Sequence, residues 1–186
     1  MKYNAEEITL ILLERLARVI NNDAALSAIK PAQWEALRFF SQANRFSRTP
    51  SALTAYLGVT KGTVSQTINV LERKGLIQKV SAEKDRRSVS ITLTQSGLSL
   101  LNDDPLKSLT DSIKQLNHNQ VETFNQTLKS VLSSALKQRE GVPFGACRTC
   151  KYFKENFPEG NPHQCSLLHV PLSNADSQLI CREHAS

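Results

Sequence analysis

The hydrophobic period changes once near the middle of the chain, and this change limits the possible folds more than any other feature. Residues 49–75 resemble two short helices, each preceded by a capping threonine and followed by a glycine. These start and stop residues are Thr49 with Gly58 and Thr60 with Gly75. Residues 88–94 then alternate between polar and apolar side chains, as in a strand with one buried face. Two short helices followed by a hairpin predict a winged helix-turn-helix.

Amphipathic helices are predicted on both sides of this unit. Apolar residues at helical spacing run from Asn4 to Asn22, and a second helix begins at Pro31 and reaches about Ala43. Beyond the hairpin, a helix capped by Thr94 is expected to be interrupted at Pro105, and further helices continue to residue 140. The expected fold is therefore mainly α-helical with a small β-hairpin wing.

The outer helices carry more apolar surface than a winged core of about 70 residues needs. The last long helix is expected to bury Val121, Phe124, Leu128, Val131 and Leu132. Excess apolar stripes at both ends of the chain favour an intermolecular helical bundle, and hence a homodimer. In the alternative, the same helices close a larger monomeric core.

Positive charge is concentrated in the winged part. The chain holds 23 lysines and arginines against 17 aspartates and glutamates, a formal charge of +6. Residues 30–98 alone contain eleven basic and four acidic side chains, a net charge of +7, so the rest of the chain is nearly neutral. Such a distribution favours an anionic partner such as double-stranded DNA.

The second helix of a helix-turn-helix reads base edges in the major groove. Val64, Ile68 and Leu71 form its inward face, which leaves a polar face for DNA. The candidate contacts are Thr60, Lys61, Thr63, Ser65, Gln66 and Asn69. Asn and Gln can pair with adenine, Lys can reach guanine or phosphate, and the Thr methyl can contact thymine.

The predicted hairpin pairs residues 76–80 with residues 88–94 around a charged loop at 81–87. The candidate DNA contacts of this wing are Lys84, Asp85, Arg86 and Arg87. A guanidinium group oriented by a carboxylate is suited to a minor groove, where the negative potential attracts it.

The segment from Leu53 to Leu76 resembles the helix-turn-helix of MarR-family transcriptional regulators. Asp85-Arg86-Arg87, followed by Leu93-Thr94 and Gly97, resembles the wing signature of that family. The resemblance covers roughly residues 4–140. It implies a triangular homodimer that binds a pseudo-palindromic operator and usually represses, with Asp85 holding Arg87. It also implies a possible small-molecule effector.

All four cysteines lie in the last forty residues, at Cys147, Cys150, Cys165 and Cys181. Thiolates are soft ligands, and a segment too small for its own core gains a constraint from a metal. The spacing resembles that of small high-potential iron–sulfur proteins, and zinc and an iron–sulfur cluster both remain open. The alternatives are a histidine ligand (His163, His169 or His184) in place of one cysteine, or cysteines without metal, as free thiols or disulfides.

These features predict a regulatory domain at 1–140, a linker at 141–146 and a metal-binding module at 147–186. The predicted function is a DNA-binding repressor whose metal centre is structural or senses metal or redox state. The alternative is an interaction or electron-carrier module built on the cysteines, with a winged helix that does not bind DNA. No catalytic motif, membrane span or signal peptide is recognised, so a non-enzymatic cytoplasmic protein is expected.

Overall fold

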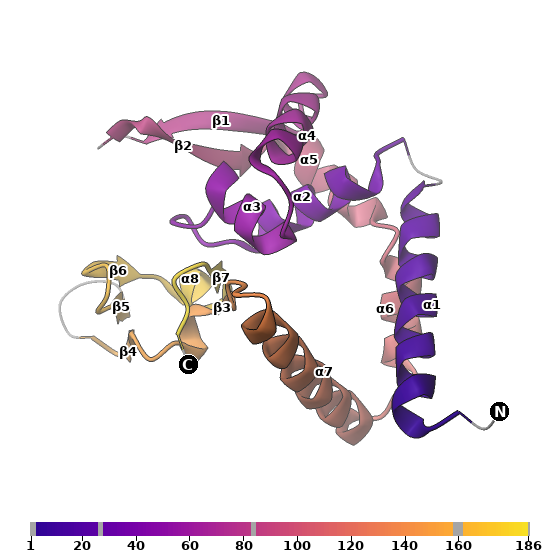
Figure 1. Cartoon of the computed structure of the whole chain (residues 1–186). Helices are drawn as coiled ribbons and strands as arrows, with labels where there is room; N and C mark the ends of the chain where they lie inside the picture. Colours follow the sequence, from indigo (N-terminus) through magenta and orange to yellow (C-terminus); the bar gives the residue numbers. More distant parts are fainter. Residues whose placement is uncertain (1–2, 26–27, 83–84, 158–161, 186) are drawn as a thin grey trace.

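The computed structural model describes residues 3–25, 28–82, 85–157 and 162–185 of the chain. Figure 1 shows a winged core, a long first helix, a second long helix that forms a separate arm, and a small C-terminal module. The described residues are mainly helical with a β-hairpin, so the predicted fold class is confirmed.

Two helices lead into the winged core. Helix α1 spans Ala5–Ala25 and helix α2 spans Pro31–Gln42, which begins at a proline as expected. Helix α2 is buried along one face, and its Phe39 and Phe40 rings meet edge to face with centroids 5.4 Å apart. Helix α2 therefore packs along one side of the core.

The helix-turn-helix consists of α3 (Pro50–Leu57) and α4 (Lys61–Arg73). The Thr49 hydroxyl accepts a hydrogen bond from the Ala52 amide and caps α3. Gly58 ends that helix in the left-handed conformation, with φ 65°. The predicted boundaries of both helices are therefore confirmed.

The wing is an antiparallel pair of strands, β1 (Ile77–Ala82) and β2 (Asp85–Leu93). The prediction of a loop over residues 81–87 is wrong, because strand pairing continues to Ala82 opposite Asp85. An irregularity in register between Ser81 and Ala82 lets the pairing extend through this polar stretch.

The main core lies where α2, α3, α4 and the wing meet. The largest fully buried side chains here include Trp34, Phe39, Phe40 and Leu37 of α2. Leu53 of α3, Leu71 of α4 and Ile91 of β2 complete the contact between helices and wing. Helix-turn-helix and wing thus share one apolar interior.

After the wing, α5 (Gln95–Leu100) and a short 3₁₀ turn (Leu101–Asp103) lead to α6 (Lys107–Lys114) and α7 (His118–Gln138). The break at Pro105 is confirmed. In Figure 1, α7 extends away from the winged core, and its C-terminal end leads to the small module.

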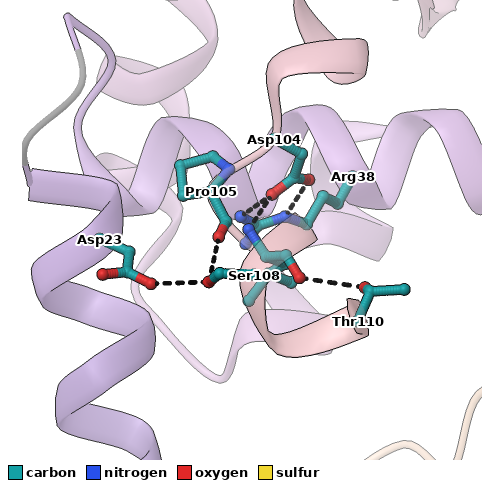
Figure 2. A network of polar contacts seen from close by, with 7 residues as sticks. Asp23, Arg38, Asp104, Pro105, Ser108 and Thr110 are labelled. Carbon is teal, nitrogen blue, oxygen red and sulfur yellow. Dashed lines mark hydrogen bonds and ion pairs between the residues drawn. The ribbon is translucent and has the colours of Figure 1, made fainter. Parts of the chain in front are cut away.

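A polar network joins the winged core to the outer helices (Figure 2). Arg38 of α2 donates from Nε and Nη2 to the two carboxylate oxygens of Asp104, at 2.7 and 2.6 Å. Asp104 also accepts from the Leu106 amide, at 2.7 Å. Ser108 of α6 donates to Asp23 of α1, at 3.0 Å. These contacts fix the segment before α6 to α2, and α6 to α1.

The outer helices leave their apolar residues uncovered in the single chain. The predicted burial of the α7 stripe is wrong for one chain, because Val131 is 51% and Leu132 59% exposed. On α1, Leu10 and Leu12 are 69% and 56% exposed. Both helices therefore present apolar faces without cover from the described part of their own chain.

The described residues of the C-terminal module form two small sheets, a 3₁₀ turn (Cys147–Thr149) and a short α-helix. Strand β3 (Gly145–Ala146) pairs with β7 (Ile180–Cys181). Strands β4 (Phe153–Glu155), β5 (His163–Cys165) and β6 (Val170–Leu172) form an antiparallel sheet, and α8 spans Asn174–Gln178.

This module is packed against the winged core. Phe144, within the predicted linker, places its ring edge-on to Phe39 and Tyr56, with centroids 5.9 and 5.2 Å away. Ile180 also packs on the main core and forms a parallel bridge with Ala43. The segment before Cys147 is therefore part of the packing that fixes the module in place.

Candidate nucleic-acid interface

Helix α4 has one buried face and one exposed polar face. Val64, Ile68 and Leu71 are buried against the core, as the sequence predicts. The opposite face carries the exposed side chains of Lys61, Thr63, Ser65, Gln66 and Asn69. The predicted base-reading residues therefore lie together on one accessible helix surface.

Thr60 has a local structural role at the start of this helix. Its hydroxyl accepts from the Thr63 amide at 3.2 Å and lies 2.9 Å from the Thr63 hydroxyl. This capping arrangement satisfies a free amide at the helix terminus. It also places both threonines at the end of α4 that enters a major groove in helix-turn-helix proteins.

Lys79 on β1 is a residue of this surface that the sequence analysis missed. Its ammonium group donates to Asn69 Oδ1 at 3.0 Å and pairs with Glu72 at 2.6 Å. The contact holds the Asn69 amide in one orientation. Strand pairing places Lys79 opposite the buried Ile91, on the face of β1 that meets α4, and no local sequence pattern predicts this contact.

A shallow groove of about 370 Å³ lies where α3, α4 and β1 meet. Its lining includes Ser51 and Thr54 of α3, Lys61 and Ser65 of α4, and Lys79. Most of these groups are hydrogen-bond donors, and two are cationic, so the groove offers a surface suited to phosphate or base edges.

The wing is fixed to the helix-turn-helix by its backbone. The Ile91 amide of β2 donates to the Arg48 carbonyl at 2.7 Å, just before α3 begins. Asp85, Arg86 and Arg87 lie on β2, where the structure describes the backbone but not these side chains. Lys84 lies outside the described residues. The predicted pairing of Asp85 with Arg87 stays a prediction.

The cysteines of the C-terminal module lie near the turn between α2 and α3. Cys147 and Cys181 are buried in one small apolar cluster, and Cys165 packs on it half-buried. Cys150 follows one turn after Cys147, and its sulfur is 3.5 Å from the Ala185 amide nitrogen. All four are free thiols in the structure.

Cys147 and Cys181 interact directly. A hydrogen bond from Cys147 lowers the pKa of the Cys181 thiol to about 5, and the same bond raises the pKa of Cys147. Within the ranges that the structure describes, no group of three or more His, Cys, Asp or Glu side chains is arranged to hold a metal ion.

The histidines considered as alternative ligands lie at different places in the module. His163 is buried, with Nε2 at 2.9 Å from Asn174 Oδ1, and His184 Nε2 is 3.0 Å from the Thr149 hydroxyl. The Nδ1 atoms of both rings are buried without a hydrogen-bond partner among the described residues. His169 lies in a turn with φ 53°.

Two residues of the winged core contact the buried cysteines. Asn44, which is 1% exposed, donates from Nδ2 to Cys147 Sγ at 3.3 Å. The Ser47 hydroxyl hydrogen-bonds to Cys181 and accepts from the Arg182 amide at 2.9 Å. The turn between α2 and α3 is therefore in direct contact with the cysteine cluster.

Sequence comparison gives matches to the winged part of the chain. The family model described as the MarR family matches residues 29–88. The HTH-type transcriptional regulator SarZ of Staphylococcus haemolyticus (strain JCSC1435) is 29% identical over 76 residues, covering 39% of this chain and 50% of SarZ. The chain thus spans about half the length of this curated relative.

Solved structures are similar over more of the chain. Wild-type MarR from E. coli in its apo form is 22% identical, with a TM-score of 0.54, and covers 71% of this chain and 98% of its own. The S. aureus MepR–DNA complex is 23% identical, with a TM-score of 0.54, and covers 72% and 99%. A MarR transcriptional regulator from Methanosarcina mazei Go1 is 23% identical, with a TM-score of 0.57, and covers 70% and 98%.

No helix among the described residues is long and apolar enough to cross a membrane. Residues 29–88, which contain the helix-turn-helix with its exposed polar face, are similar to the MarR family. About seven-tenths of the chain has the fold of solved MarR-type proteins.

Proposed function

We propose that this protein is a sequence-specific DNA-binding transcriptional regulator. The observation that carries the proposal is the accessible polar face of α4 beside a cationic groove, in a segment with a net charge of +7. In the proposed complex, α4 lies in the major groove with Gln66 and Asn69 toward base edges. The wing, with Lys84, Arg86 and Arg87, lies along the backbone or in the minor groove.

The proposed active form is a homodimeric repressor on a pseudo-palindromic operator. The uncovered apolar faces of α1 and α7 support a second copy of the chain as their partner. A two-fold dimer would present two α4 helices to two half-sites about one helical turn apart. A bound small-molecule effector stays a prediction.

We also propose that the C-terminal module holds a metal centre on Cys147, Cys150, Cys165 and Cys181. The support is chemical and positional, because two of these thiols are in contact, a third packs beside them, and the module has little apolar core of its own. Zinc and an iron–sulfur cluster are the two candidates.

The DNA-binding proposal is tested by fluorescence anisotropy with a labelled duplex selected from a random pool by the wild-type protein. We expect log affinity to fall steeply with log salt, because lysines and arginines displace counterions. Arg87→Ala should weaken binding to all duplexes, with a salt slope smaller by about 1 if it contacts a phosphate. Lys129→Ala on α7, outside the winged part of the chain, is the control.

The competing proposal is an interaction or electron-carrier module. It would be favoured if wild-type protein bound no duplex in a salt-sensitive way, or if Arg87→Ala bound as well as wild type at every salt concentration. The similarity in fold to the S. aureus MepR–DNA complex favours the regulatory proposal.

A further inference from the structure

The C-terminal module reaches the helix-turn-helix through one arginine. Arg182 donates from Nη1 to the Ser51 hydroxyl at 2.9 Å. Ser51 is an exposed residue at the start of α3, and it lines the groove that also contains Lys61 and Lys79. The Arg182 guanidinium group therefore lies at the edge of the surface that faces DNA in the proposed function.

The backbone of Arg182 is fixed before any DNA arrives. Its amide donates to the Ser47 hydroxyl at 2.9 Å, and Ser47 is only 1% exposed. The preceding residue, Cys181, is buried and pairs with Gly145 in the sheet of β3 and β7. A side chain that extends from fixed backbone loses less conformational freedom when it binds a partner.

The guanidinium group keeps donors available for a further partner. Arginine carries several N–H donors, and within the described residues the side chain of Arg182 uses one of its nitrogens, on Ser51. No carboxylate in the described part of the chain pairs with it. Glu183, the next residue, lines a different groove with Phe46 and Val89. The positive charge of Arg182 is thus available to an anion from outside the chain.

The position of Ser51 indicates which part of DNA this charge meets. In a helix-turn-helix complex the second helix enters the major groove, and the first helix crosses the sugar–phosphate backbone. Ser51 lies in the first turn of the first helix, α3, so a cation bonded to it lies beside phosphates rather than base edges. A planar guanidinium group suits phosphate oxygens, because its parallel N–H groups can bind two of them together.

The rest of the module offers DNA little electrostatic attraction. From Cys147 to Ser186 four basic residues balance four acidic ones, so the module has no formal net charge. Of these four basic residues, all within the described part of the chain, Arg182 is the one whose side chain hydrogen-bonds to the helix-turn-helix. It also lies outside residues 29–88, which match the family model. A DNA contact at this position is therefore an addition to the winged helix.

We propose that Arg182 of the C-terminal module binds a DNA phosphate beside α3, so that the module extends the DNA-binding surface of the winged helix. The inference rests on the proposed function and adds one contact in each half-site. Ser51 orients the guanidinium group, and Arg182 supplies the charge. Binding the phosphate releases a condensed counterion, so the contribution of Arg182 depends on salt concentration.

Salt titration of the full-length protein on the selected duplex tests the charge. Arg182→Gln keeps a hydrogen-bond donor but removes the charge. We expect it to weaken binding to all duplexes by about fivefold to tenfold at about 0.1 M salt, and to lower the slope of log affinity against log salt by about 0.9, the release expected for one phosphate contact. Arg182→Lys, which keeps the charge, should retain the wild-type slope.

Two further variants are controls, and circular dichroism confirms that each variant has wild-type helix content. Ser51→Ala removes the hydrogen bond but leaves the charge, so its salt slope should equal that of wild type. Lys154→Ala, which removes an exposed cation on β4 of the same module, should bind DNA as wild type does. If Arg182 only attaches the module to α3, Arg182→Gln and Ser51→Ala should lose affinity alike with the wild-type slope, which would overturn the proposal.

A second measurement locates the contact on DNA. Phosphates of the selected duplex are replaced one at a time by neutral methylphosphonates, and each duplex is tested with wild-type protein and Arg182→Gln. We expect one position in each half-site where the replacement weakens wild-type binding but leaves binding by Arg182→Gln unchanged. If every replacement affects the two proteins equally, Arg182 contacts no phosphate and the proposal is wrong.

These outcomes separate the inference from the proposed function. Wild-type protein that binds no duplex in a salt-sensitive way would overturn both. A steep salt dependence that Arg182→Gln shares in full would leave the DNA-binding function standing and overturn the role of Arg182.

Discussion

A single lysine connects the wing to the exposed polar face of α4. Lys79 comes from the wing but contacts Asn69 and Glu72 of α4, so the recognition helix and the wing meet at a side-chain level. Asn69 is therefore oriented before any DNA arrives, whereas Gln66 is exposed and makes no such contact with Lys79. Of the two amides, Gln66 is the freer to adapt to a base pair.

At this scale we expect Gln66→Ala to relax base preference at one position of the operator. Loss of a bidentate amide contact removes about 1 to 3 kcal/mol of discrimination. The measurement is competition binding with duplexes that differ at single positions. Gln126→Ala on α7 is the control, and an unchanged preference at every position in Gln66→Ala would remove this residue from base readout.

Among the secondary-structure elements, α5 packs closely against the backbone that leads into the wing. Gly97 of α5 lies against the Leu76 carbonyl, and a Cβ placed there would collide with that backbone oxygen. The Thr94 hydroxyl caps α5 by accepting from the Gly97 amide, and Thr94 Oγ1 itself donates to the Gly75 carbonyl. Strand and helix are therefore locked together without space for a side chain.

We expect Gly97→Ala to lower the free energy of unfolding by about 1 to 3 kcal/mol, because backbone must move to admit a methyl group. Urea unfolding followed by circular dichroism measures it. Gly62→Ala in α4 is the control, since a Cβ there would meet the Thr60 hydroxyl at an ordinary contact distance of 3.8 Å, and the change should be neutral or stabilising by about 1 kcal/mol. Equal stability of the two variants would contradict the packing argument.

The Arg38–Asp104 pair connects two elements across the exit from the core (Figure 2). Burial raises the pKa of Asp104, but the hydrogen bonds from Arg38 and the Leu106 amide more than offset it, so the pKa is lowered. A lowered folded-state pKa stabilises the fold above the unfolded value of about 4, and this stability is lost as pH falls through the folded value.

We therefore expect Asp104→Asn to lower the free energy of unfolding by about 1 to 3 kcal/mol at neutral pH, the usual cost of losing hydrogen bonds to a charged group. The difference from wild type should shrink as the pH falls below about 4. Unfolding curves at several pH values measure it. Asp111→Asn, whose exposed carboxylate bonds only Lys114 nearby, is the control. A difference that stayed constant down to pH 2 would contradict this assignment.

Elements with strong local signals could be predicted from the sequence. The caps at Thr49 and Thr60 and the stop at Gly58 depend on neighbours within four residues, and the structure has them as expected. The contacts of Asn44 with Cys147 and of Lys79 with Asn69 join distant residues, 103 and 10 positions apart. Such pairs depend on how whole elements pack, which no local pattern encodes.

At the scale of the whole molecule, packing within the described part of one chain does not explain the apolar faces of α1 and α7. Both helices carry exposed apolar residues, and α7 stands apart from the winged core. Apolar faces of this size in a charged, basic chain favour burial against another copy rather than contact with water.

We expect wild-type protein to be a dimer by light scattering at micromolar concentration, and Leu12→Glu with Leu132→Glu to be largely monomeric, because a buried carboxylate without a partner is costly. The double variant should also bind an operator with two half-sites more weakly than wild type. Leu168→Glu, an exposed change in the C-terminal module, should remain dimeric. A monomeric wild-type protein would refute the dimer proposal.

The bridge between Ala43 and Ile180 has a consequence for how this architecture can be exchanged between proteins. The last forty residues share buried backbone with the start of the helix-turn-helix, so they are not an independent cassette. A chimera that joins this tail to another winged helix should fold only if the receiving turn, with Asn44 and Ser47, is transplanted with it. Tail and turn thus form one structural unit, although 98 residues lie between them along the chain.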